Sequence, residues 1–414
     1  LAFPVSAQGP DQIAYLGPGG SVWLADLESG ETGQLAEAQG FTSLNWSPDG
    51  QRLLLVAGGP IDAGQGEVYV LEPESRDLIR AGEGYAPIWT SDSQRILYVS
   101  NYTFTEEGTE QSLSIYSLQD GSSQALVTQR WVSGLWPIER VAYSADDQFI
   151  AVYVAGLEME GFIVIVDAEG NSVWDIPDMV YSAESFDWSP GNHELVYRDS
   201  GAPFMGGEDP SLRIVDVQSQ ETKQSFEQAG FWPRWSPDGG AIAALVWAEG
   251  SAFQVMRVDP GEAEPVLLAD EVFGDLWNSE LRWSPDGSLL VCTSAEEGRG
   301  QVHVMDRLGS LVTIAEGQDP ELSWSPEGDR VAVAVGEGEP KELVIVGADG
   351  SGQRRVGDGW MPAWRPIVEG EPAAQPICAL PTIGSVGAVV LALTILRAGG
   401  PFGGRSSQTE RLAR

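Results

Sequence analysis

Residues 235–239 read Trp-Ser-Pro-Asp-Gly, and related stretches return along the whole 414-residue chain. Four units keep Trp-Ser-Pro, an acidic residue and Gly, and consecutive units lie 40 to 54 residues apart. The aromatic residues that open the units are Trp46, Trp89, Tyr143, Trp188, Trp235, Trp283, Trp324 and Trp364. Repeats of this length, filled with short strands, are typical of β-propeller blades.

The residues of the motif indicate a hairpin turn between the first two strands of each blade. Proline presets the second position of a type I turn, and glycine accepts the positive φ that the end of the turn requires. Apolar strands follow the turn, as in Leu53–Val56, and a third strand comes later, as in Phe162–Asp167. A fourth strand after a polar turn would complete an antiparallel blade.

The first and last units of the chain complement each other. Seven full units run from Phe41 to about Gly359, and the eighth has only its first strand, Met361–Trp364. Three further strands are predicted at the N-terminal end, within residues 12–35. We therefore predict an all-β propeller of eight four-stranded blades with one-plus-three closure, which hides sheet edges. Seven blades is the alternative, if the split blade or the irregular Tyr143 blade does not form.

These repeats resemble those of the TolB-like, or WD-like, β-propeller family over roughly residues 8–366. The resemblance rests on the Trp-Ser-Pro-acidic-Gly units, from which the Trp89 and Tyr143 units depart. It implies the propeller fold and, as in known members, binding of proteins or peptides or gating beside a hydrolase. Because this fold carries many functions, the resemblance does not settle the function.

The two ends of the chain predict an exported, anchored protein. Residues 377–396 are twenty uncharged residues, long enough for a transmembrane helix across about 30 Å. The tail after them carries four Arg and one Glu, a net +3, and the rest carries −38 − 3 = −41. By the positive-inside rule the tail lies in the cytoplasm and the propeller outside the cell membrane. A sorting signal that is later cut is the alternative.

The predicted domain boundaries follow from these features. Residues 1–7 resemble the end of a secretory signal peptide, although a plain fragment boundary would look the same. The propeller is expected over 8–366, a linker over 367–376, the transmembrane helix over 377–396 and a basic cytoplasmic tail over 397–414.

Composition excludes several kinds of chemistry. A formal charge of −38 opposes binding to nucleic acid, which needs clustered Lys and Arg. The two cysteines, Cys292 and Cys378, make no disulfide framework, and His193 and His303 are too few for a zinc cluster. No phosphate loop, HExxH or CxxC pattern occurs. We expect no metal, no cofactor and no catalytic residue.

Aromatic residues also stand in the segments that enter the innermost strands, a few residues before the repeat aromatic. These loops are predicted to open around the central channel, on the face whose connections vary most in length. Varied loops on a rigid scaffold are where binding usually resides. The candidate ligand-binding residues at this channel mouth are Phe41, Tyr85, Trp136, Tyr181, Trp232, Trp277 and Trp360. The alternative is that they wedge between neighbouring blades.

We therefore expect a membrane-anchored, non-enzymatic module that binds a protein, peptide or glycan. One alternative is a propeller glycosidase or lyase that uses carboxylates in the channel. Another is a structural envelope or adhesive protein whose acidic shell keeps it soluble. Exposed aromatics at the channel mouth would favour the first function, and converging carboxylates the second.

Overall fold

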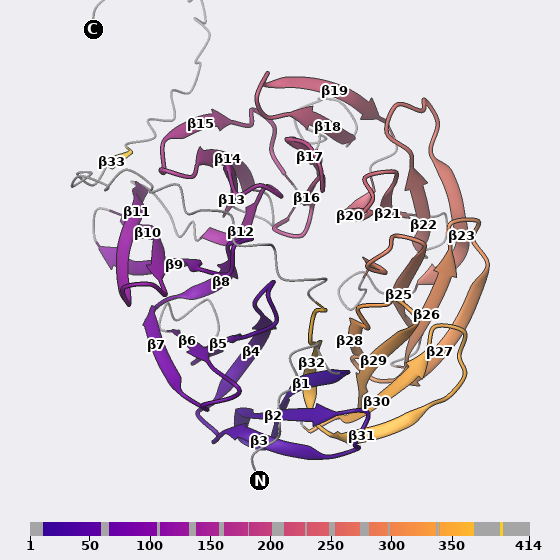
Figure 1. The fold of residues 1–414 in the computed structure, drawn as a ribbon. Coiled ribbons are helices and arrows are strands. Elements are labelled where there is room, and N and C mark those ends of the chain that lie inside the picture. Colours follow the sequence, from indigo (N-terminus) through magenta and orange to yellow (C-terminus); the bar gives the residue numbers. More distant parts are fainter. Residues whose placement is uncertain are drawn as a thin grey trace, which may run out of the picture.

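The computed structural model is a closed ring of blades around a central channel (Figure 1). It describes residues 11–58, 66–105, 108–131, 138–156, 161–180, 182–200, 211–227, 230–247, 253–273, 281–296, 299–336, 338, 340–367 and 390–391. Its sheets confirm the predicted eight blades of four antiparallel strands and exclude the seven-blade alternative.

The first strand of each blade lies innermost and the fourth outermost. Blade 1 consists of β4 (Phe41–Trp46), β5 (Leu53–Ala57), β6 (Glu67–Leu71) and β7 (Leu78–Glu83). Blade 2 consists of β8 (Tyr85–Trp89), β9 (Arg95–Thr105), β10 (Gly108–Ser117) and β11 (Ser122–Trp131). Blade 3 consists of β12 (Ile138–Tyr143), β13 (Phe149–Ala155), β14 (Gly161–Asp167) and β15 (Ser172–Asp175). Blade 4 consists of β16 (Phe186–Trp188), β17 (Glu194–Arg198), β18 (Leu212–Asp216) and β19 (Glu221–Phe226).

The second half of the ring repeats this order. Blade 5 consists of β20 (Phe231–Trp235), β21 (Ile242–Trp247), β22 (Phe253–Val258) and β23 (Val266–Phe273). Blade 6 consists of β24 (Leu281–Trp283), β25 (Leu289–Glu296), β26 (Arg299–Asp306) and β27 (Leu311–Gly317). Blade 7 consists of β28 (Glu321–Trp324), β29 (Arg330–Val335), β30 (Glu342–Gly347) and β31 (Arg354–Asp358). Blade 8 joins β32 (Trp360–Trp364) to β1 (Gln12–Gly17), β2 (Ser21–Asp26) and β3 (Thr32–Ala36), with the 3-10 turn η1 (Pro18–Gly20) between β1 and β2.

Blade 8 closes the ring as predicted. Strand β32 pairs with β1 in antiparallel register, with Trp364 opposite Ile13. Arg365, buried just after β32, donates through Nε to the Gly50 carbonyl of blade 1 (2.7 Å) and through Nη1 to Gln12 Oε1 (2.9 Å). Both ends of the propeller are thereby fixed to each other and to the next blade.

The motif turns have a common hydrogen-bond pattern. In blade 6, Ser284 Oγ donates to Asp286 Oδ1 (2.6 Å) and accepts from the Leu289 amide (2.9 Å), while Gly287 has a φ of +69°. Ser93 and Asp147 take a φ of +58° at the equivalent glycine position. The turn therefore forms in blades 2 and 3 too, although their sequences depart from the motif.

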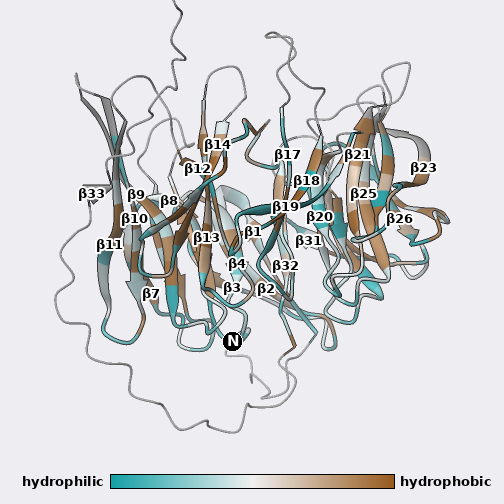
Figure 2. Cartoon of the chain, turned by 90° about the horizontal axis from the view of Figure 1, so that it is seen from above, coloured by the Kyte–Doolittle hydropathy of each residue, from teal (hydrophilic) through white to brown (hydrophobic). Residues whose placement is uncertain are grey.

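Four of the repeat tryptophans, Trp46, Trp188, Trp283 and Trp324, join neighbouring blades. Their indole N–H groups donate to the carbonyl that precedes the repeat aromatic of the blade before: Trp46 to Ala363 (3.0 Å), Trp188 to Ala142 (3.1 Å), Trp283 to Arg234 (2.9 Å) and Trp324 to Arg282 (3.2 Å). Apolar side chains fill the space between facing sheets, and Figure 2 shows hydrophobic residues along the strands between the two faces. This packing makes the inner strands a rigid frame for the channel.

The predicted transmembrane helix lies outside the described residues except for Val390–Leu391. These two residues form β33, which pairs in parallel with β11 at the outer edge of blade 2. Within the part of the chain that the structure describes, no helix is long and apolar enough to cross a membrane.

Candidate functional site

Three of the predicted channel-mouth aromatics are buried. Phe41 is 1% exposed and packs edge-to-face on Tyr69, with ring centroids 5.7 Å apart. Tyr85 is 6% exposed and donates through its hydroxyl to the Ile138 carbonyl of blade 3 (2.9 Å). Trp360 is 5% exposed. These three correspond to the packing alternative, because they present no face to a ligand. Trp136, Tyr181 and Trp277 lie outside the described residues.

A backbone bulge shared by three inner strands accompanies this burial. The segments Tyr85-Ala86-Pro, Phe231-Trp232-Pro and Trp360-Met361-Pro each place a non-glycine residue at positive φ before proline, +49°, +52° and +51°. The strand register shifts at the same points, and bulges redirect side chains. The first aromatic of each segment lies in the core or at its edge, and Met361 lines the channel cavity. Trp232 has the equivalent position in blade 5 and is partly exposed.

The residue just before each repeat aromatic faces the channel. In blades 1 and 4 to 8 it is partly or fully exposed between two buried neighbours, and successive side chains of a strand point to opposite sides. We call these positions the channel ring: Asn45, Ile88, Ala142, Asp187, Arg234, Arg282, Ser323 and Ala363.

Charge is distributed unevenly around this ring. Blades 4, 5 and 6 contribute Asp187, Arg234 and Arg282 to the ring. Blade 3 adds Arg140 from β12, the inner strand that also holds the ring residue Ala142. Blades 7, 8, 1 and 2 contribute only neutral residues to the ring. The ring positions are therefore charged on the side of blades 4 to 6 and neutral on the side of blades 7, 8, 1 and 2, which we call the neutral side after these positions alone. We call Arg140, Arg234 and Arg282 the arginine cluster.

Two of these arginines converge on one carboxylate, that of Glu184 in the loop before β16. Arg140 Nη1 lies 3.4 Å from Glu184 Oε2, and Arg234 Nη2 donates to the same oxygen. The Glu184 side chain remains 53% exposed, whereas those of both arginines are 22% exposed. The carboxylate therefore lies at the solvent side of the two guanidinium groups.

The two acids beside the arginine cluster, Glu184 and Asp187, have opposite pKa shifts. Enclosure by the surrounding walls acts to raise the pKa of Glu184, but Arg140, Arg234 and Arg282 outweigh it and hold that pKa below its usual value. Burial raises the pKa of Asp187, and the arginines with the Trp235 amide (2.8 Å) oppose the rise without cancelling it. Neighbouring acids with opposite shifts can serve as acid and base.

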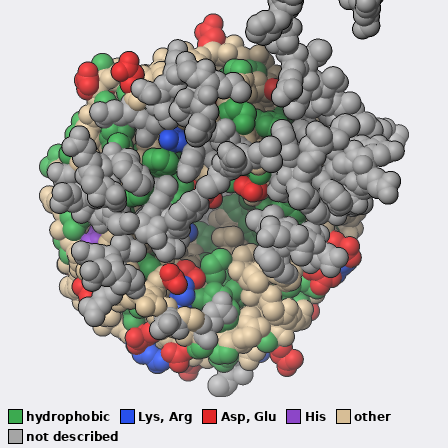
Figure 3. Space-filling view, turned by 180° about the vertical axis from the view of Figure 1, so that it is seen from behind, with side chains coloured by type: hydrophobic (Ala, Val, Ile, Leu, Met, Phe, Trp, Pro, Cys, Tyr) green, Lys and Arg blue, Asp and Glu red, His purple; other side chains and the backbone are tan. Residues whose placement is uncertain are grey.

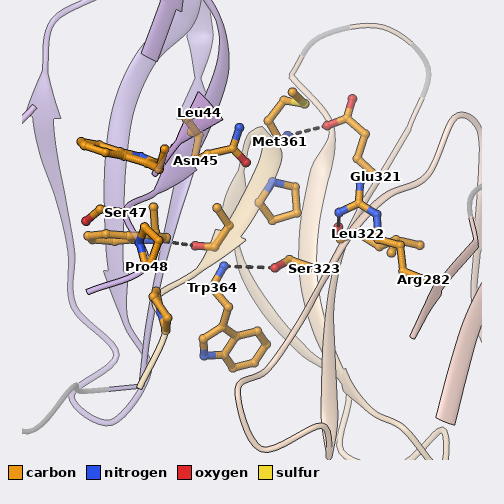
Figure 4. A pocket seen from close by; sticks show the side chains of 15 residues that line it. Leu44, Asn45, Ser47, Pro48, Arg282, Glu321, Leu322, Ser323, Met361 and Trp364 are labelled. Carbon is orange, nitrogen blue, oxygen red and sulfur yellow. Dashed lines mark hydrogen bonds between the residues drawn. The ribbon is translucent and has the colours of Figure 1, made fainter. Parts of the chain in front are cut away.

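A cavity of about 430 Å³ opens between β4, β28 and β32, on the neutral side of the channel (Figure 4). Asn45 and Arg282 reach it from opposite walls, and Ser323 accepts a hydrogen bond from the Trp364 amide (3.1 Å). Glu321 accepts from the Met361 amide and from Lys341 Nζ (2.8 Å). The volume of the cavity falls in the range of small-ligand pockets, which is about 300 to 1,000 Å³.

Arg282 belongs both to the lining of the cavity and to the arginine cluster. Arg282 donates through Nη1 to the Leu322 carbonyl (3.2 Å) and acts electrostatically on Glu184.

Figure 3 shows the face opposite to that of Figure 1, hollowed near its centre, with hydrophobic and charged side chains around the hollow.

Other reactive side chains lie away from the channel. His303 is buried between Ser294 Oγ (2.9 Å) and Thr313 Oγ1 (3.0 Å), and burial lowers its pKa. Cys292 is a free, buried cysteine, and burial raises the pKa of its thiol. His193 pairs with Asp146 (2.8 Å). Among the described residues no cluster of three His, Cys, Asp or Glu is placed to hold a metal ion.

Sequence reasoning did not find the channel residues Arg140, Glu184, Asp187, Arg234 and Arg282. A usable signal was present for Asp187, Arg234 and Arg282, since each directly precedes a repeat tryptophan and strand alternation turns that position away from the packed side. Nothing in the sequence marks Glu184, because it lies in a loop.

No protein-family model matches the chain. A curated relative, the uncharacterized peptidase YuxL of Bacillus subtilis (strain 168), is 34% identical over 158 residues. The match covers 35% of this chain and 23% of the relative, so the chain spans less than a quarter of the relative's length.

Several solved structures share the propeller fold. Dihydro-heme d1 dehydrogenase NirN has a TM-score of 0.59 and 13% identity, covering 87% of this chain and 76% of that one. Oligogalacturonate lyase from Vibrio parahaemolyticus has a TM-score of 0.52 and 14% identity, covering 79% and 95%. TolB from Acinetobacter baumannii has a TM-score of 0.41 and 19% identity, covering 76% and 82%. At these identities the likeness to the first two structures concerns the fold alone, and membership of the TolB-like, or WD-like, family stays a prediction.

Proposed function

We propose that this propeller is a non-enzymatic binding module that receives part of a protein, peptide or glycan in its central channel. The observation that supports the proposal is the uneven channel wall: a cavity of about 430 Å³ on the neutral side shares Arg282 with the arginine cluster. A cavity with a few convergent polar groups is the usual form of a small-ligand site.

The rigid frame supports recognition instead of a large conformational change. The inner strands that carry the ring are held by indole hydrogen bonds between neighbouring blades and by the Arg365 closure. Preorganised side chains lose little entropy when a ligand binds. The proposal therefore places the ligand on the ring and at Trp232, not on the buried aromatics.

The test is a glycan and peptide array probed with the wild-type protein and with the double variant Asn45→Ala, Arg282→Gln. The matched control is Arg355→Gln, since Arg355 is 55% exposed on the outer strand β31. Binding that is lost in the double variant and kept in the control would support the channel. Equal binding by all three proteins would contradict it, and absence of any binding would favour the structural role.

A second candidate is a glycosidase or lyase that uses the channel carboxylates. The observation in its favour is the pair Glu184 and Asp187, whose pKa values are shifted in opposite directions. The name of the Vibrio protein is that of a lyase, and the name of YuxL, a peptidase, is that of an enzyme of another class. Conversion of an array ligand by wild type, abolished in Asp187→Asn, would establish this function; binding without conversion would exclude it for that ligand.

We also propose that residues 377–396 anchor the propeller to the cell membrane, with the propeller outside; in the anchored protein Val390 and Leu391 then leave their pairing with β11. The support is the uncharged run and the +3 tail that follows it. The full chain should appear in the membrane fraction and be cut by added protease on intact cells. Recovery of the full chain in the soluble fraction would overturn the anchor.

A further inference from the structure

Glu184 is held like a bound ligand. Arg234 contacts it twice, through Nη1 to the Glu184 carbonyl (3.0 Å) and through Nη2 to the side-chain carboxylate. Arg140 approaches the same carboxylate from blade 3. Arginine side chains that converge from two blades on one oxygen form the arrangement with which proteins recognise a carboxylate.

The arginines do not depend on the Glu184 carboxylate for their orientation. Arg140 Nη1 also donates to the carbonyls of Ala183 and Phe186 (3.0 Å each), and its guanidinium lies 4.4 Å from the centroid of the Phe186 ring. Arg234 Nη1 also donates to the Pro233 carbonyl (3.0 Å). If the Glu184 side chain left, both guanidinium groups would keep backbone acceptors and remain preorganised.

The local charge also favours an anion. Three guanidinium groups face two carboxyl groups, those of Glu184 and Asp187, and the pKa of Asp187 is raised. Among these five described groups the guanidinium groups outnumber the carboxyl groups by 3 − 2 = 1, within a protein of net charge −38. Desolvated charges in a confined channel interact more strongly than at an open surface.

We propose that the arginine cluster is a subsite for a free carboxylate of the ligand and that Glu184 occupies this subsite until the ligand displaces it. This inference rests on the proposed function, because the ligand reaches the subsite through the adjoining cavity. Arg282 lines that cavity and acts on Glu184, so one guanidinium group connects the entrance to the subsite. The neutral residues Asn45 and Ser323 face the uncharged part of the ligand.

The probes are small carboxylates that reproduce the Glu184 side chain. Propionate and glutarate carry the required group, and propionamide is the neutral counterpart of propionate. Glu184→Ala opens the space of the side chain, and Glu184→Gln keeps its shape without its charge. The matched control is Glu169→Gln, which removes one carboxylate from an exposed turn outside the channel.

Calorimetric titration at pH 7 and low salt should show at least about tenfold tighter binding of propionate and glutarate to Glu184→Ala than to wild type. The Glu184 carboxylate is tethered to the protein and competes with the added carboxylate at an effective concentration in the millimolar range or above. Its removal leaves the arginine cluster open to the added carboxylate. Glu169→Gln should bind as wild type does, and propionamide should gain nothing. Adding Arg234→Gln to Glu184→Ala should abolish the gain while the unfolding transition is retained.

Equal affinity of wild type and Glu184→Ala, or equal binding of propionamide and propionate by Glu184→Ala, would overturn the subsite. The array experiment and the titration can give different answers. If the Asn45→Ala, Arg282→Gln variant loses array ligands but the titration is negative, the channel binds a ligand and the carboxylate subsite is wrong. Two pairs of compounds then identify the source of the carboxylate. One pair is a peptide with a free C-terminus and the same peptide with an amidated C-terminus. The other pair is a uronic acid and its neutral sugar. In each pair the charged member should bind better, and a preference for both neutral members would also overturn the subsite.

Discussion

Arg365→Ser separates two ways of reasoning about this ring. Arg365 occupies the position that serine has in other motif units, so the repeat pattern predicts that serine would fit or even stabilise the protein. The structure predicts the opposite. Ile367 stands where the motif has its acid, so a serine at 365 would find no carboxylate partner there. It would also remove the hydrogen bonds to Gly50 and Gln12.

The magnitude follows from these contacts. Each hydrogen bond from a charged donor contributes about 1.5 to 3 kcal/mol, and an unsatisfied buried acceptor costs about as much. Arg365 also lies 5.1 Å above the Trp46 ring, which adds about 0.5 to 1 kcal/mol. Burial lowers the pKa of Arg365, and relief of that desolvation cost offsets part of the loss. We expect a net destabilisation of about 2 to 4 kcal/mol, a large share of typical stabilities of about 5 to 15 kcal/mol.

Equilibrium unfolding in guanidinium chloride, followed by tryptophan fluorescence, measures this change. The matched control is Arg355→Ser, because Arg355 forms only exposed ion pairs with Glu342 and Asp358. Such pairs contribute about 0 to 1 kcal/mol. The reasoning would be refuted if Arg365→Ser unfolded at the same denaturant concentration as wild type, or at a higher one.

Two further predictions concern the pH dependence and the turns. Because His303 is buried with a lowered pKa, it is neutral in the folded protein, and the unfolded chain binds its proton first as pH falls below about 6.5. Stability should therefore decline from pH 7 to pH 5, by at most about 1.4 kcal/mol per pH unit from this group. The slope of the unfolding free energy against pH should flatten in His303→Gln, and an unchanged slope would contradict the assignment. Gly239 has a φ of +71°, and Gly239→Ala should cost about 1 to 2 kcal/mol. Gly191→Ala, at a turn glycine without positive φ and with open space around it, should cost less in the same unfolding measurement; equal losses would show that φ is not the cause.

The blades were predictable because their signals are local. The Ser-Pro-Asp-Gly turn depends on residues within five positions of one another, as the contacts of Ser284 show. The split closure followed from counting, since the last unit has one strand at the C-terminal end and three unassigned strands stand at the N-terminal end. Even the Tyr143 unit keeps the turn, because Asp147 accepts the positive φ that glycine takes elsewhere.

The candidate aromatics show where local reasoning failed. Phe41, Tyr85 and Trp360 precede their repeat aromatics much as expected, but the sequence could not show which way each side chain points. The direction of each side chain depends on the bulges at Ala86 and Met361 and on the neighbouring blade that covers the aromatic side chain.

The sequence by itself determined the repeated turn, the blade length and the number of blades, because each arises from contacts between residues close in the chain. Only the tertiary structure decided the channel. Arg140, Arg234 and Arg282 stand 94 and 48 residues apart along the chain, and only the packing of consecutive blades brings their charges to one carboxylate, Glu184. The role of each of these side chains therefore depends on which blade faces it, and packing between blades decides that.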